Sequence, residues 1–245
     1  MSNWLNQVIL FMNNFAEKYS VYYSKTFYEI SAAFEIGCFL SLVKYYESKG
    51  CTVKPKNLGE NNEYRYLTTP NGNPDNFSFL SLEKNEKHFQ LRQQVRILCS
   101  HIDQEIAFTP DIVVIKKDTE IINRIDNDYA NGKRRFFCID SNDVIAAHEC
   151  KSLVPFPELL VSFIGLVFTA HSWLLNPNDC SMVDNSGLHL APTLFIGGTA
   201  RGLHIRMINS MKRNFPINIV TGIHLGWNLF IKNNDLKYLR DNIFY

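Results

Sequence analysis

The chain has 245 residues, of which 46% are hydrophobic and 20% charged, and this composition is typical of a globular protein with a sizeable core. Its 25 Lys and Arg against 24 Asp and Glu give a net charge of +1, which excludes a strong overall cationic field. Any binding of nucleic acid must therefore come from local basic patches or from a bound metal ion.

The cysteine usage indicates a reducing compartment. Six cysteines are scattered along the chain without a CxxC pair, and several lie inside apolar runs. This pattern favours free thiols over a disulfide framework or a zinc knuckle. The N-terminus lacks a basic leader followed by an apolar run, so we expect a cytoplasmic protein without a signal peptide.

Two helices are expected at the N-terminal end. Between residues 4 and 28, aromatic and aliphatic side chains recur every three, four or seven positions, which predicts an amphipathic helix or a helix pair. Its apolar face packs on the core or forms an oligomer interface. A second helix is expected from Glu29 to Ser48. Glu35 lies in its apolar part, where an unpaired carboxylate would be costly.

Residues 51 to 98 are harder to assign. Prolines, glycines and asparagines predict a long irregular region up to residue 90, with a short strand at Cys51 to Lys54. Near-alternation from Phe89 to Leu98 then favours a strand, although a helix is also compatible with it.

Two short apolar runs carry the acidic residues of interest. Asp111 stands at the start of the run Ile112 to Ile115, and Glu149 and Lys151 end the run that begins at Val144. Residues two apart on a strand point to the same face, so Glu149 and Lys151 should meet one site. With Asp111 on a neighbouring strand, the three would form a small metal site.

The segment between these runs reads as a hairpin-like insertion. Asn131-Gly132 is a turn signal, Phe136 to Ile139 a strand, and Ser141 to Asp143 the turn into the run that carries Glu149. The basic triplet Lys133-Arg134-Arg135 either contacts phosphates or is simply solvated.

The remainder alternates helices and strands. Pro157 and Glu158 are typical of a helix start, and the apolar run from Leu159 to His171 is too short to span a membrane, so we expect a fully buried helix. Strands at 193–196 and 217–220 flank a basic helix at 201–213, with Gly197-Gly198 as a turn or a phosphate cradle. This order favours an α/β sheet.

Pro110-Asp111 followed by Glu149-Cys150-Lys151 resembles the motif of the PD-(D/E)xK nuclease superfamily, over roughly residues 30 to 225. Partial matches elsewhere, at Pro74-Asp75, Glu47-Ser48-Lys49 and Asp235-Leu236-Lys237, lie in polar sequence and not on a buried strand. The resemblance implies a restriction-endonuclease-like fold, a mixed central sheet flanked by helices. We expect an N-terminal helical segment at 1–28, the nuclease core at 29–225 and a C-terminal extension at 226–245.

The resemblance also implies roles for these residues. Asp111 and Glu149 would be ligands of Mg²⁺, with Mn²⁺ as a possible substitute and the Cys150 backbone carbonyl as a further oxygen ligand. Lys151 would orient or help deprotonate the attacking water. Glu35 either joins the site, directly or through water, or belongs to the polar stripe of its helix; the sequence leaves both open. His148 and Cys150 fall on the opposite strand face and are expected in the core.

The expected function is a Mg²⁺-dependent endonuclease that hydrolyses double-stranded DNA, leaves a 5′ phosphate, and serves restriction or anti-phage defence as a homodimer or larger oligomer without a membrane partner. Two alternatives stay open: a catalytically silent nucleic-acid-binding or assembly module, and a nuclease effector switched on by a ligand. In a purely structural interpretation, Glu149 and Lys151 form a strand pair and Asp111 caps a turn. Zinc-binding and serine-hydrolase motifs are absent from the sequence.

Overall fold

The computed structural model describes residues 3–23, 29–67, 73–126, 134–175, 187–227 and 236–239. Its helices are α1 (Asn3–Tyr19), α2 (Ile30–Ser48), α3 (Pro157–Ala170), the short α4 (Ser172–Leu175) and α5 (Leu203–Asn214). Pro157 at the first turn of α3 and Glu158 beside it are the expected start signals of that helix.

A seven-stranded mixed sheet forms the centre, in the order β1-β2-β3-β6-β9-β10-β11. Its strands are β1 (Thr52–Lys56), β2 (Phe79–Lys84), β3 (Lys87–Gln93), β6 (Ile112–Lys116), β9 (Val144–Lys151), β10 (Thr193–Ile196) and β11 (Asn218–Val220). Neighbouring strands from β1 to β9 are antiparallel, whereas β9, β10 and β11 are parallel and are connected through α3 and α5. The carboxyl ends of these last three strands therefore meet at one edge.

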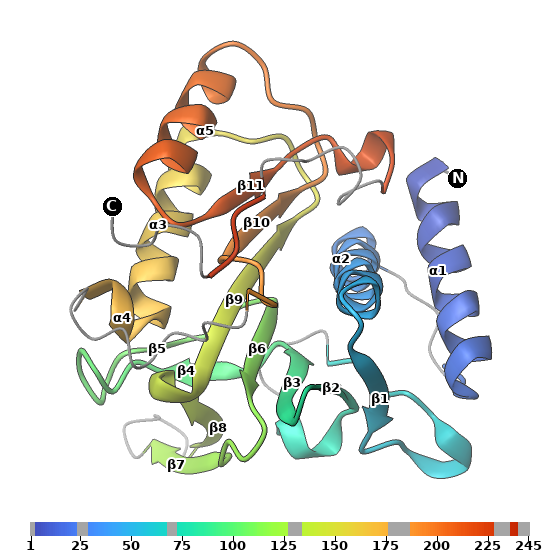
Figure 1. Cartoon of the computed structure of the whole chain (residues 1–245). Coiled ribbons are helices and arrows are strands. Elements are labelled where there is room, and N and C mark those ends of the chain that lie inside the picture. The colour runs from blue at the N-terminus through green and yellow to red at the C-terminus, as the bar shows by residue number, and fades with distance from the viewer. Residues whose placement is uncertain are drawn as a thin grey trace.

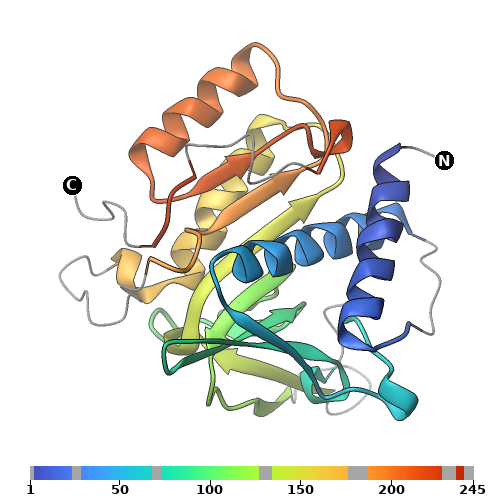
Figure 2. The same cartoon turned by 45° about the vertical axis from the view of Figure 1, so that its right-hand side comes forward.

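Helices cover both faces of this sheet (Figure 1). Helix α2 lies across one face with α1 outside it, as Figure 2 shows, and one hydrophobic cluster joins both helices to β2, β3, β6 and β9. A separate cluster joins α3 and α5 to β10 and β11. The sheet is thus the middle of three layers.

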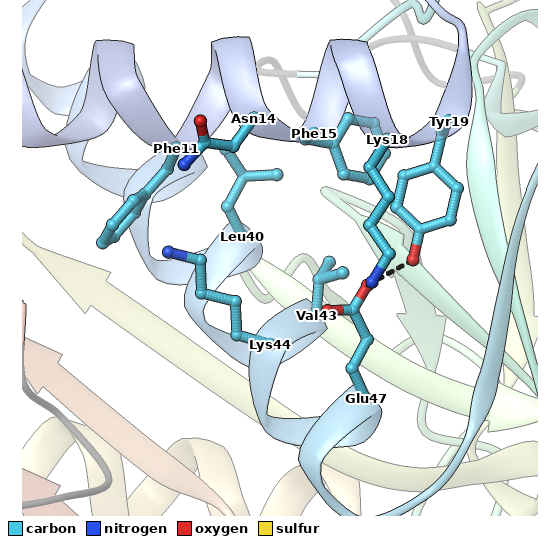
Figure 3. Close-up of a pocket in the computed structure, with 9 residues that line it drawn as sticks. All are labelled: Phe11, Asn14, Phe15, Lys18, Tyr19, Leu40, Val43, Lys44 and Glu47. Carbon is cyan, nitrogen blue, oxygen red and sulfur yellow. Dashed lines mark hydrogen bonds and ion pairs between the residues drawn. The ribbon is translucent and has the colours of Figure 1, made fainter.

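A cavity of about 60 Å³ remains between α1 and α2. Figure 3 shows Lys18 and Tyr19 of α1 both pointing to the carboxylate of Glu47 on α2, where Lys18 Nζ lies 2.7 Å from Glu47 Oε1 and the Tyr19 hydroxyl donates a hydrogen bond to the same oxygen. The cavity has room for a few water molecules at most, so a nucleotide does not fit there.

A smaller four-stranded sheet, in the order β5-β4-β8-β7, lies beside the central one. It consists of β4 (Arg96–Leu98), β5 (Ala107–Phe108), β7 (Ile122–Asp126) and β8 (Arg134–Asp140). Its core side packs against β6 and β9 through Ile97 of β4 and Ile139 of β8. The insertion between Asp111 and Glu149 forms the β7-β8 hairpin of this sheet, as its sequence indicated.

Several expectations are confirmed. The structure is a mixed α/β fold with a mixed central sheet, as predicted. The helix after Glu29, the strand that follows Asp111 and the strand that contains Glu149 also lie where the sequence placed them. None of the described helices combines the length and the apolar composition needed to span a bilayer. The turn signal Asn131-Gly132 and Lys133 lie outside the described residues, as do residues 24–28.

Three expectations are wrong. Residues 79–90 are not irregular but form the β2-β3 hairpin. The run from Phe89 to Leu98 is not one strand: it breaks at Gln94 and contributes to two different sheets. Helix α3 is not fully buried, because Leu160, Phe163 and Val167 face the core while Val161 is exposed to solvent.

Candidate active site

Asp111 and Glu149 lie side by side at one end of the central sheet. Asp111 directly precedes β6, and Glu149 and Lys151 are at the carboxyl end of β9. The register of these antiparallel strands pairs Ile112 with His148, so the next position along places Asp111 opposite Glu149. Both carboxylates are buried.

Lys151 joins the two carboxylates. Its Nζ lies 3.1 Å from Asp111 Oδ2 and 2.7 Å from Glu149 Oε2. This confirms that Glu149 and Lys151 share a face of the strand. The backbone N–H of Cys150 also donates to Asp111 Oδ2, at 2.7 Å, so the position of Asp111 is fixed by the main chain of β9.

Glu35 and Asp111 are connected through Gln94. The Gln94 Nε2 donates to Asp111 Oδ1 at 2.9 Å and to Glu35 Oε2 at 3.0 Å. The backbone N–H of Gln94 donates to the Asp111 carbonyl at 3.0 Å. The structure therefore brings Glu35 from α2 to the same place as Asp111, Glu149 and Lys151.

Gln94 is the residue of this site that sequence analysis missed. It follows the last residue of β3 and has a left-handed backbone conformation, with a φ of 51°, which turns its side chain toward the acids. A glutamine at a strand end is common and has no motif of its own. Its position beside Asp111 depends on pairing between β3 and β6, which the sequence pattern does not specify.

Acidic groups outnumber basic groups in the site, because three carboxyl groups lie near the one ammonium group of Lys151. Burial, reinforced by repulsion from Asp111, raises the pKa of Glu149 to about 8. Burial and the charge of Asp111 likewise raise the pKa of Glu35 to about 7. Burial alone would lower the pKa of Lys151, but Asp111 and Glu149 together outweigh it and the pKa ends above its ordinary value. Additional positive charge at this site would therefore be stabilised.

The opposite face of β9 belongs to the core. His148 and Cys150 are buried there, as the strand period predicted, and His148 lies beside the Phe195 ring of β10. Burial raises the pKa of the Cys150 thiol well above its ordinary value, so this residue is a packed thiol.

The donors of the site suit a hard divalent cation. Carboxylate oxygens of Asp111, Glu149 and Glu35, with the Cys150 backbone carbonyl, are the class of ligand that Mg²⁺ prefers. Within the described ranges, no three or more His, Cys, Asp and Glu side chains are already grouped to hold a metal ion. The Lys151 ammonium lies between Asp111 and Glu149, so it would have to move aside for both carboxylates to bind one ion.

No protein-family model, no curated protein and no solved structure matches this chain. The assignment of this site rests on its motif, its geometry and its charge.

Proposed function

We propose that this protein is a Mg²⁺-dependent nuclease that hydrolyses phosphodiester bonds of DNA. The observation that carries the proposal is the convergence of Asp111, Glu149 and Lys151 with Glu35 at one end of the sheet. Glu35, Asp111 and the pair Glu149 and Lys151 come from three separate parts of the sequence, and a purely structural strand pair would not require them all.

The order of elements supports the same proposal. A helix that carries Glu35, three antiparallel strands β3, β6 and β9, then a helix and the parallel strand β10 form the centre of the fold. The motif acids stand at the start of the middle strand and at the end of the third. This arrangement is compatible with the restriction-endonuclease-like core that the sequence resemblance implies.

Hydrolysis of a phosphodiester needs a water nucleophile, a counter-charge for the phosphorane-like transition state and stabilisation of the leaving oxygen. Mg²⁺ would lower the pKa of a bound water and neutralise charge on the phosphate. Asp111, Glu149 and the Cys150 carbonyl would hold the ion, and Glu35 would bind it directly or through water. Gln94 keeps Asp111 and Glu35 aligned by donating to both.

Lys151 acts as a cation in this scheme. In the ion-free site, the charges of Asp111 and Glu149 raise the pKa of Lys151, which favours its ammonium form. Its role is to donate hydrogen bonds to the attacking water and to the phosphate oxygens as negative charge develops there. Of the two roles that the sequence left open for Lys151, we propose orientation of the attacking water.

The proposal is tested by plasmid cleavage with Mg²⁺ and with EDTA, using the wild-type chain and the variants Glu149→Ala and Lys151→Ala. The chain offers a matched control, because Lys54 and Glu83 form an exposed ion pair of the same length, 2.7 Å, between β1 and β2. We expect metal-dependent cutting that Glu149→Ala and Lys151→Ala abolish and that Glu83→Ala and Lys54→Ala retain. Circular dichroism verifies that each variant is folded.

No cutting together with no Mg²⁺ binding by calorimetry contradicts the proposal. Mg²⁺ binding without cutting of DNA or RNA indicates instead the effector that needs an activating ligand. DNA binding with neither metal binding nor cutting indicates the catalytically silent module. A dimer with two such sites would cut both strands of a duplex, and analytical ultracentrifugation tests that state directly.

A further inference from the structure

The connections after the three parallel strands form one surface next to Lys151. We call residues 152–156, 197–203 and 222–226 the loop rim. They follow β9, β10 and β11, whose carboxyl ends lie at the same edge of the sheet, toward the top of Figure 1. In open α/β sheets, ligands bind at this edge.

Backbone hydrogen bonds hold the loop rim together. The Gly197 N–H donates to the Lys151 carbonyl at 2.9 Å, and the Gly198 N–H donates to the Leu153 carbonyl at 2.8 Å. The Gly222 N–H in turn donates to the Gly198 carbonyl at 2.8 Å. The three loops are therefore stacked on one another, directly beside the candidate catalytic lysine.

Both glycines of the middle loop are needed for this stacking. A Cβ on Gly198 would lie 2.7 Å from Val154 Cα, and one on Gly197 would overlap the His224 ring. Gly197-Gly198 thus serves close packing of the loops, which favours the turn interpretation over a phosphate cradle made by these two residues.

The loop rim exposes apolar side chains. Val154 is 63% exposed and Leu225 80% exposed, and three further large apolar residues of the rim are also exposed: Leu153, Phe156 and Leu203. Single exposed apolar residues are ordinary, but five on three stacked loops beside a polar site are not. Such a surface is suited to contact apolar groups of a ligand.

The surroundings of the loop rim are positively charged. Residues 187–227 contain Arg201, Arg206, Lys212 and Arg213 and no Asp or Glu, although acids and bases are balanced over the whole chain. Residues 152–156 also lack acids. Arg201, Arg206 and Arg213 are exposed, and none of them forms an ion pair within the part of the chain that the structure describes.

We infer that the loop rim holds the unpaired bases of a nucleic-acid strand beside the catalytic site, while Arg201 and Arg206 contact its phosphates. The inference rests on the proposed function. In a paired duplex the faces of the bases are stacked and closed, whereas an unpaired strand presents both anionic phosphates and apolar base faces. An apolar surface inside an acid-free basic region complements both features. The substrate class is therefore DNA with single-stranded or locally unpaired segments.

The test is binding of fluorescent 20-residue DNAs by the full chain in EDTA, followed by anisotropy, so that cleavage is not required. The probes are a duplex, the same duplex with a central four-base mismatch bubble, and one strand alone. We expect the bubble and the single strand to bind about tenfold more tightly than the duplex, because base contacts add to the phosphate contacts.

Two double variants, each with a control, separate the contribution of base contacts from that of phosphate contacts. Val154→Ser with Leu225→Ser should remove the preference for unpaired DNA. Leu10→Ser with Ile125→Ser, which are also exposed apolar residues but lie on α1 and β7, should retain it. Arg201→Ala with Arg206→Ala should weaken binding of all three probes and reduce the salt dependence. Lys56→Ala with Lys117→Ala, which removes two exposed positive charges on β1 and after β6, is the matched control.

Equal binding of the bubble and the duplex, or a preference that survives Val154→Ser with Leu225→Ser, overturns the inference. If the wild-type chain nevertheless cuts plasmid DNA with Mg²⁺, the proposed function stands and only the role of the loop rim fails. Absence of binding to every probe together with absence of cutting contradicts both. A wild-type oligomer that dissociates in the Val154→Ser, Leu225→Ser variant would make the rim a protein interface and overturn the inference as well.

Discussion

Gln94 holds two acids of the site in place relative to each other. Its side-chain amide donates to both Asp111 and Glu35. Replacing Gln94 by methionine, which is similar in shape, therefore removes the donor from a buried acceptor on Asp111 and from a partly buried one on Glu35. We expect Gln94→Met to lower the free energy of unfolding by about 1–3 kcal/mol in urea denaturation.

The neighbouring Gln93 is a matched control for this change. It is also buried, but its Nε2 has no hydrogen-bond partner among the described residues. Gln93→Met should therefore cost little or stabilise the fold, because it removes an unsatisfied donor. Equal losses for Gln93→Met and Gln94→Met would show that the amide of Gln94 has no special role.

A substitution of Glu35 distinguishes the two interpretations that the sequence left open: a residue of the metal site, or part of the polar stripe of α2. It is held by Gln94 beside Asp111, so Glu35→Gln should weaken Mg²⁺ binding about tenfold in isothermal titration calorimetry. Glu17→Gln, an exposed acid on α1, should leave the affinity unchanged. Unchanged affinity for Glu35→Gln would assign Glu35 to a structural role.

The residues of the site differ in how far the sequence could indicate them. Asp111, Glu149 and Lys151 stand at the ends of buried apolar runs, and the two-residue strand period alone places Glu149 and Lys151 on one face. Gln94 could not be found in this way, because its contacts depend on a left-handed backbone at a strand end. The position of Glu35 near Asp111 could not be found either, because it depends on how α2 packs on the sheet.

At the scale of elements, two helical glycines have opposite roles. A Cβ on Gly37 of α2 would lie 2.2 Å from the Trp227 ring and 2.8 Å from Val8 Cγ2, whereas one on Gly165 of α3 meets nothing within 4 Å in the described structure. We expect Gly37→Ala to destabilise the protein by about 1–3 kcal/mol through overpacking. Gly165→Ala should stabilise it by about 0.5–1 kcal/mol, because alanine favours helix.

Thermal and urea unfolding of these two variants measure the difference. Stabilisation by both substitutions would mean that α1 and Trp227 do not pack closely on α2. Gly37→Ala therefore tests the contact of α2 with α1 and with Trp227.

Helices and buried strands could be predicted because their periodicity is local, whereas the β2-β3 hairpin was missed. Its turn residues Asn85 and Glu86 both have positive φ. Asn-Gly is the usual sequence signal for such a turn, and here a glutamate stands in place of the glycine, so the turn could not be recognised from the sequence. The preceding Pro- and Gly-rich segment further suggested a loop. Leu80 and Leu82, opposite Leu91 and Phe89, carried an alternation that was too short to outweigh these signals.

At the scale of the whole molecule, the partition of strands into two sheets could not be derived from the sequence. Strand β4 pairs in parallel with β8, about forty residues later, although it directly follows β3 of the central sheet. Pairing over such distances depends on which apolar faces meet. The mixed α/β class, in contrast, follows from the order of elements alone.

The stability of the whole fold should depend on pH through His171, at the end of α3. Burial lowers the pKa of His171 from 6.5 to about 4, while its Nδ1 lies 2.9 Å from the Val167 carbonyl and its ring contacts Trp173. Between pH 6.5 and 4 the unfolded chain binds a proton that the folded chain does not. The free energy of unfolding therefore falls as the pH falls through this window, and His171 alone accounts for about 2 kcal/mol between pH 8 and pH 5.

His171→Asn keeps an N–H near the position of Nδ1 but cannot take up this proton. We expect the loss of stability between pH 8 and pH 5, measured by urea unfolding at each pH, to be smaller by about 2 kcal/mol in this variant than in the wild type. Near-ultraviolet circular dichroism at pH 8 verifies that its core is intact. An identical pH dependence in the two proteins would mean that His171 is protonated in the folded state, and that the junction between α3 and the central core admits water.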